Sequence, residues 1–138
     1  MQISQPVHLA AFRRDPLRIV IDIDGVDLSS VPVRYAVGLY PDIDPAFRSL
    51  TLGPTTVPGG DGVRLVSVTY RDGLASSRFE IIASKGLIAA LPKAAEPGDD
   101  FALAHELGVD ALPIADGLTP VETTLFTGTL TIKGSIND

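Results

Sequence analysis

The chain has 138 residues, no cysteine and a formal net charge of −6 at pH 7, and 45% of its residues are hydrophobic. This length predicts one domain with its own core, and the missing thiols exclude a disulfide framework and any thiolate metal site. The acidic balance argues against a nucleic-acid partner, because phosphate binding needs clustered Lys and Arg, and the small basic group at Arg13, Arg14 and Arg18 includes Asp15.

No signal-peptide pattern is found in residues 1–11, and no apolar run is long enough for a membrane-spanning helix. The sequence therefore predicts no membrane partner and synthesis in the cytoplasm. Residues 1–15 are predicted to be a polar N-terminal arm, with Pro6 and Pro16 marking extended or turning backbone. Residues 16–138 are predicted to form a single β-sandwich domain.

Residues 17–24 predict the first strand of this domain. Leu17, Ile19, Ile21 and Ile23 alternate with polar or outward residues, which is the period of a half-buried strand. Asp24 and Gly25 then suit a turn with positive φ. The same reasoning predicts six further strands, at about residues 31–40, 47–52, 63–70, 76–83, 101–109 and 122–136.

The connections between these strands have their own signals. Asp72 and Gly73 predict a tight hairpin, and the Gly- and Pro-rich residues 53–62 predict a mobile surface loop. Residues 84–91 are the only plausible helix, limited to about two turns by Gly86 and Pro92. The predicted fold class is all-β: an immunoglobulin-like antiparallel β-sandwich of about seven strands with one short helical turn. A β-barrel is the alternative.

The carboxylates at residues 22–27 resemble a calcium loop in their alternation. However, Gly25 comes too early for an EF-hand, and no glutamate closes the loop. Asp22 and Asp24 are therefore predicted to point outward from a strand that runs into a turn. Asp42 and Asp44 could add ligands, but Asp before Pro is also ordinary turn chemistry. We predict no bound metal.

The residues show no recognisable catalytic site. His8 and His105 are the only histidines, and His105 lies on the apolar face of its predicted strand, where a hydrogen-bonded, partly buried imidazole is expected. Ser76 and Ser77 lie on a hairpin outside any nucleophile-elbow pattern. Asp99 and Asp100 would point to opposite faces, and Gly59-Gly60-Asp61-Gly62 lacks the Lys and the setting of a phosphate loop. We therefore predict no catalytic residue, no cofactor and no enzymatic activity.

Threonines occupy most of one face of the last predicted strand, opposite Phe126, Leu130 and Ile132. A β-branched polar residue suits a solvated strand face or a sheet edge that meets another subunit. The predicted contacts with partners run through the strand at 122–136 and through the loops at 53–62 and 111–120.

The order of elements resembles the small β-sandwich proteins of tailed bacteriophages and prophages, and is similar to the N-terminal domains of baseplate upper proteins. The matching segments are Phe12-Arg13-Arg14, the strand at 17–23, Gly25-Val26-Asp27-Leu28-Ser29, the strand at 31–37, Leu91-Pro92, the strand at 101–109 and Gly128-Thr129-Leu130-Thr131-Ile132.

This resemblance implies a non-enzymatic structural subunit of a phage or prophage tail, located in the virion. It would act through contacts with copies of itself or with neighbouring virion proteins. The alternative function is a ligand-binding module, of the carbohydrate-binding or adhesin-like kind, which exposed aromatic residues on one face would favour.

Overall fold

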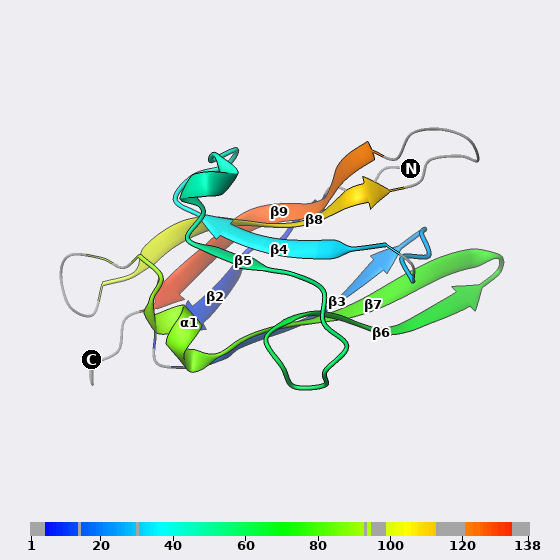
Figure 1. Ribbon diagram of the computed structural model, residues 1–138, viewed down its shortest axis with the longest axis horizontal. Helices are drawn as coiled ribbons and strands as arrows, with labels where there is room; N and C mark the ends of the chain where they lie inside the picture. Colours follow the sequence, from blue (N-terminus) through cyan, green and yellow to red (C-terminus); the bar gives the residue numbers. More distant parts are fainter. Residues whose placement is uncertain are drawn as a thin grey trace.

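The computed structural model describes residues 5–13, 15–29, 31–92, 94, 99–112 and 121–133, which form two β-sheets that face each other (Figure 1). In the larger sheet the strands follow the order β1, β9, β8, β4, β5, and β2 also pairs with β9. The bounds of these strands are β1 (Gln5–Pro6), β2 (Leu9–Phe12), β4 (Val33–Gly38), β5 (Leu50–Leu52), β8 (Phe101–Leu112) and β9 (Val121–Lys133).

The smaller sheet has the order β3, β7, β6 and is antiparallel throughout. Its strands are β3 (Leu17–Asp24), β6 (Gly62–Arg71) and β7 (Leu74–Ala83). Strands β6 and β7 are joined by Asp72 and Gly73, whose φ angles of 52° and 79° fit a hairpin turn with two left-handed residues. The hairpin predicted at this dipeptide is confirmed.

The predicted all-β sandwich is confirmed, and each of the seven predicted strands has a counterpart. The immunoglobulin-like subclass stays a prediction; it is supported by the separation of β3, β7 and β6 from β4, β8 and β9 into opposite sheets. The predicted helical turn is α1 (Lys85–Ala89), which lies where the chain passes from β7 towards β8 (Figure 1). A second short turn, the 3₁₀ segment η1 (Pro45–Phe47), follows β4. Within the described part of the chain, no helix has the length and apolar character needed to cross a membrane.

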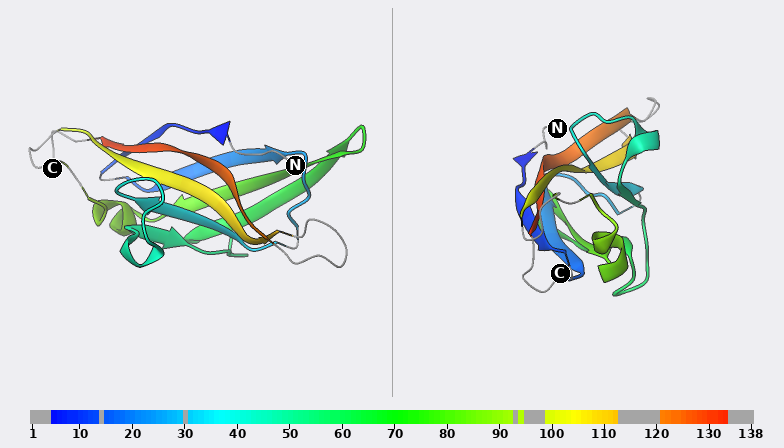
Figure 2. Two further views of the ribbon diagram at one scale, coloured as in Figure 1. Left: turned by 90° about the horizontal axis from the view of Figure 1, so that it is seen from above. Right: turned by 90° about the vertical axis from the view of Figure 1, so that its left-hand side faces the viewer.

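The N-terminal segment differs from the predicted arm, because residues 5–12 contribute β1 and β2 to the larger sheet. Both strands run parallel to β9, with Gln5 beside Phe126 and Phe12 beside Lys133 (Figure 2). The reason is a short inward alternation of Val7, Leu9 and Ala11, all at least partly buried against the core. Strand β9 therefore has neighbours on both sides from Phe126 to Ile132, so of the two alternatives predicted for its Thr-rich face, the sheet edge does not hold there.

The core lies between the two sheets and follows the predicted alternation. Leu17, Ile19 and Ile23 are buried, whereas Ile21 is only partly buried against the same cluster. From the larger sheet, the inward residues of β4, β8 and β9 close the core from the other side. The fully buried large side chains include Tyr35, Leu103, Leu107, Phe126, Leu130 and Ile132 from this sheet, and Ile81 from β7.

The alternation in β3 can be tested with two neighbouring residues. Ile19→Ala removes a buried side chain and leaves a cavity, so it should lower the free energy of unfolding by about 2–5 kcal/mol. Val20→Ala on the outward face, where Val20 is 47% exposed, should cost about 0.5 kcal/mol or less. Chemical denaturation of both variants measures the two values, and equal losses would show that the inward face is misassigned.

Candidate functional site

His105 is buried in the core of the larger sheet, with both ring nitrogens in contact with hydrogen-bonding atoms. Its Nδ1 lies 2.9 Å from the hydroxyl of Tyr35, and its Nε2 lies 2.6 Å from the carbonyl oxygen of Val7. The ring also contacts Tyr35 edge-on and packs against Phe126. The expectation of a hydrogen-bonded core imidazole at this position is confirmed.

These partners determine which nitrogen carries the proton. The Val7 carbonyl can only accept, so Nε2 of His105 must donate to it, and the neutral ring then accepts at Nδ1 from the Tyr35 hydroxyl. Burial raises the pKa of Tyr35 well above its usual range, which keeps this donor protonated. Burial also lowers the pKa of His105, outweighing the Val7 hydrogen bond, which acts in the opposite direction. His105 is therefore a neutral structural residue near pH 7.

The contact between His105 and Val7 depends on a glycine in the intervening strand. Gly128 of β9 is the register partner of His105, and a Cβ at Gly128 would overlap the carbonyl oxygen of Val7. The amide of Val7 also donates to the carbonyl of Thr127, at 2.8 Å. The absent side chain thus lets the N-terminal segment lie directly against β9 and reach the imidazole beyond it.

The carboxylates of the predicted turn at residues 22–27 each have a partner within the protein. Asp22 accepts two hydrogen bonds from the Arg78 guanidinium, at 2.7 and 3.1 Å, and Asp24 accepts one from the Ser76 hydroxyl. Asp27 accepts from the backbone amide of Ser29 and from the hydroxyl of Tyr70. The outward placement of Asp22 and Asp24 is confirmed.

Hydrogen bonds from these partners lower the pKa of Asp22 and of Asp27. Within the described residues, no three His, Asp or Glu side chains gather in an arrangement that could hold a metal ion. Asp42 and Asp44 belong to a different connection: Asp44 accepts from the amide of Ala46 and so caps η1.

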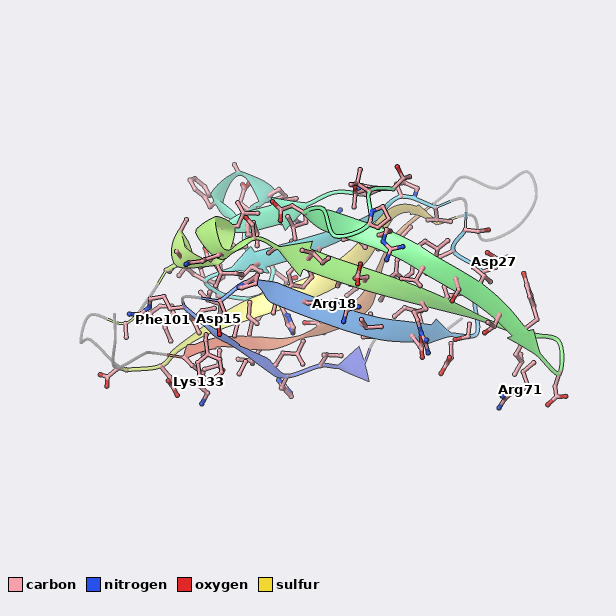
Figure 3. All side chains as sticks on the ribbon, turned by 90° about the horizontal axis from the view of Figure 1, so that it is seen from below. Asp15, Arg18, Asp27, Arg71, Phe101 and Lys133 are labelled. Carbon is pink, nitrogen blue, oxygen red and sulfur yellow. The ribbon has the colours of Figure 1, made fainter. Side chains whose placement is uncertain are left out.

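A second charged group covers the outward face of the smaller sheet. Glu80 of β7, although its side chain is only 7% exposed, lies between Arg18 of β3 and Arg64 of β6. The nearest atoms are 2.6 Å apart on the Arg18 side and 2.9 Å apart on the Arg64 side, and these two hydrogen-bonded arginines lower the pKa of Glu80. Figure 3 shows Arg18 on this face. The two ion pairs of Glu80 link β7 to β3 on one side and to β6 on the other.

A groove lies on the outward face of the other sheet. This groove has a volume of about 740 Å³, within the range of roughly 300–1,000 Å³ that small-molecule sites occupy. Small residues of β4 and β8 line it: Ala36, Gly38 and Ala104. Around them stand Arg34 and Glu106 from the strands, Thr124 and Thr127 from β9, and Tyr40, Asp42, Ile43 and Arg48 from the connection between β4 and β5.

The connection at residues 39–49 is held in place at several points. Ile43 packs against Gly38 so closely that a Cβ there would meet its side chain, and Asp42 takes a left-handed φ of 61° that turns the chain back. The Asp44 cap shapes η1, and the amide of Ser49 donates to the carbonyl of Val37 at 2.8 Å. The wall of the groove is therefore formed by the fold itself.

Glu106 links the two arginines of the groove. Its Oε1 lies 3.7 Å from Nη2 of Arg34 and 3.5 Å from Nη2 of Arg48, and both arginine side chains are 16% exposed. These distances exceed the roughly 2.7–2.9 Å of a direct charge-assisted hydrogen bond. Glu106 thus attracts both guanidinium groups by charge, and neither distance is that of a close hydrogen bond.

The remaining predicted residues are distributed over the molecule. His8 is exposed and its Nδ1 accepts from the amide of Thr129. Ser77, which sequence reasoning left without a role, is fully buried; its hydroxyl donates to the carbonyl of Val26 and accepts from the amide of Leu28, both at 2.9 Å. Asp100 pairs with Lys133 at the end of β9, while Asp99 is exposed.

Of the two loops predicted as contact sites, the structure describes the first in full and the second only in part. In residues 53–62, Gly53 and Thr55 bond to the backbone of Val63, which joins this loop to the start of β6. Of residues 111–120, positions 111 and 112 end β8, and 113–120 lie outside the described residues. In the Thr-rich strand, Thr124 and Thr127 line the groove.

No protein-family model, curated protein or solved structure matches this chain.

Sequence reasoning missed the groove, although part of its signal is visible. The predicted alternation of residues 31–40 and 101–109 places Arg34, Ala36, Ala104 and Glu106 on outward positions. A pair of small outward residues beside a pair of opposite charges is compatible with a hollow. However, their juxtaposition depends on the pairing of Gly38 with Ala104 and of Ala36 with Glu106, which alternation alone does not specify.

The close approach at Gly128 predicts a strong effect of one methyl group. Gly128→Ala should lower the free energy of unfolding by about 1–3 kcal/mol, because the N-terminal strand must shift to avoid the new Cβ. Gly86→Ala in α1 is the matched control: its Cβ would meet no atom within 4 Å, so the variant should be as stable as the parent or slightly more stable. Thermal unfolding compares the two, and equal midpoints would contradict the contact with Val7.

The lowered pKa of His105 predicts a pH dependence of stability. The unfolded chain binds a proton at His105 near pH 6.5, and the folded chain does so only at lower pH, so stability rises with pH across this window. The contribution is complete above about pH 6.5 and is lost as the pH falls from there to the folded-state pKa. The melting temperature should therefore fall between about pH 7 and pH 5.

Two variants isolate this effect. His105→Gln keeps a donor and an acceptor but does not titrate, so its melting temperature should change much less over the same range. His8→Gln should retain most of the fall seen in the parent chain, because burial lowers the pKa of His105 more than the charge of His8 does. Asp22, Asp27 and Glu80 have lowered pKa values, so their contributions are lost only at more acidic pH. An unchanged slope in His105→Gln would assign the dependence to another group.

Proposed function

We propose that this protein is a non-enzymatic structural subunit of a phage or prophage tail that acts through protein–protein contacts in the virion. Its partners are copies of itself or neighbouring tail proteins. Two kinds of observation support the proposal: the sequence resemblance to tail-associated β-sandwich proteins, and the apolar side chains exposed at the tip of the β6–β7 hairpin.

The hairpin tip is the observation that carries the contact role. Tyr70 is 64% exposed and Leu74 is 67% exposed, on either side of the two-residue turn. Strand β3 pairs with β7 only as far as Ser76, so the tip extends past its neighbour (Figures 1 and 3). Tyr70 and Leu74 belong to neighbouring register pairs, so each face of the hairpin tip carries one exposed apolar side chain. A partner can contact both, because the tight turn fixes their positions before the partner arrives.

Strand β6 extends this surface along the sheet. In the described residues β6 pairs along its length with β7 alone, apart from a bridge between Val63 and Pro54, so its other edge presents unpaired backbone groups. An irregularity between Leu65 and Ser67 leaves Val66 42% exposed and interrupts the regular ladder. A partner strand can therefore pair beside β6 next to the apolar tip.

The proposal is tested with purified phage particles from a lysogen that encodes this protein. The parent chain should be present in the particles, and chemical cross-links should join Lys85 or Lys133 to a second copy or to another tail protein. Leu74→Ser should lower incorporation several-fold with little change in melting temperature, because Leu74 is mostly exposed.

Leu39→Ser is the matched control, since Leu39 is 50% exposed but lies on the larger sheet, at the end of β4. It should leave incorporation unchanged. Absence of the protein from purified particles would overturn the tail proposal, and equal incorporation of the Leu74 and Leu39 variants would overturn the role of the hairpin tip.

A further inference from the structure

The groove on the outward face of the larger sheet has no part in the proposed contact role. It lies over β4, β8 and β9, whereas the hairpin tip belongs to the smaller sheet. Its wall is held by the packing of Ile43 on Gly38 and by the cap of Asp44. A hollow of this size with a fixed wall is suited to a small ligand, and its chemistry narrows the class of ligand.

The charges around the groove balance each other. Arg34 and Arg48 supply two positive charges, and Glu106 and Asp42 supply two negative charges. A phosphate or a carboxylate ligand would approach the two arginines against both acidic side chains, and a cation would face the reverse difficulty. The balance therefore favours a ligand without net charge.

The polar groups form a mixed set of donors and acceptors. The guanidinium of Arg48 donates, the carboxylates of Glu106 and Asp42 accept, and the hydroxyls of Thr124 and Thr127 do both. A ligand hydroxyl needs a donor and an acceptor at once, and the separation of 3.5 Å between Arg48 and Glu106 allows it to accept from one and donate to the other. Neighbouring hydroxyls on a ring repeat this requirement.

The groove also has apolar parts. Ala36 and Ala104 supply small side chains against which a ring can lie, Ile43 covers Gly38, and Tyr40 borders the groove with an aromatic ring that is 57% exposed. An aromatic face packs against the C–H groups of a ring while its surroundings contact the hydroxyls. We propose that this groove binds a neutral saccharide unit, so that the subunit carries a sugar-binding site in addition to its contact surface.

The test is a nuclear magnetic resonance titration of the full chain labelled with nitrogen-15. The probes are glucose, galactose, mannose and N-acetylglucosamine, each added alone, and sodium phosphate and sodium acetate serve as anionic probes. We expect at least one sugar to shift the backbone amide signals of Ala36, Ala104 and Thr127 in a saturable way. The anions should leave these signals unchanged at matched ionic strength.

Leucine substitutions at two alternate positions of β8 test whether binding takes place in the groove. Ala104→Leu fills part of the groove and should weaken sugar binding at least about tenfold, which is 1.4 kcal/mol. Ala102→Leu places the same side chain on the preceding outward position of β8, outside the groove, and should bind as the parent does. Thr127→Val removes one hydroxyl with little change of shape, and should also weaken binding; it keeps the test decisive if Ala104→Leu fails to fold.

Three outcomes would overturn the inference: no saturable shift with any of the four sugars, binding that persists in both Ala104→Leu and Thr127→Val, or stronger saturable shifts with phosphate or acetate than with any sugar. None of these depends on incorporation into particles, so the sugar site and the tail role are tested separately.

Discussion

The passage of the Val7 backbone over Gly128 is the contact on which the larger sheet depends. Gly128 leaves the space into which the carbonyl of Val7 fits, and that carbonyl accepts a hydrogen bond from Nε2 of His105. His105 in turn accepts from Tyr35, which is completely buried. The missing side chain of Gly128 thus allows His105 and the Tyr35 hydroxyl to form direct hydrogen bonds in the core. It also lets the N-terminal segment lie against β9, which is the only strand that β1 and β2 pair with among the described residues.

This contact also decides which surfaces of the sandwich can meet a partner. Strands β1 and β2 cover β9 from Phe126 to Lys133, so the long terminal strand has no open edge there. The three-residue β5 ends the other side of the larger sheet, and a short edge offers little for a partner strand. The ten-residue β6 is the longer open edge, and its hairpin carries the exposed apolar tip. The proposed contact surface therefore lies on the smaller sheet.

The sequence predicts the elements better than it predicts their neighbours. Strand β3 can be predicted because a period of two with β-branched residues is a local signal. The turn at Asp72 and Gly73 can be predicted because few residue types adopt a positive φ. The pairing of residues 5–12 with β9 is not readable, because the partner lies at the far end of the chain and the inward run of Val7, Leu9 and Ala11 is short. The groove needs the register between β4 and β8 and the fold-back of residues 39–49, neither of which is local.

The charged groups on the outward faces of the two sheets differ in their spacing. On the smaller sheet, Arg18, Glu80 and Arg64 meet at 2.6–2.9 Å, so the charges satisfy each other and cover the strands. On the larger sheet the corresponding distances to Glu106 are 3.5 and 3.7 Å, and the residues beneath are alanine and glycine. Short ion pairs join the strands that carry them. Longer ones around small side chains leave oriented polar groups facing a space, which is the arrangement that ligand recognition requires.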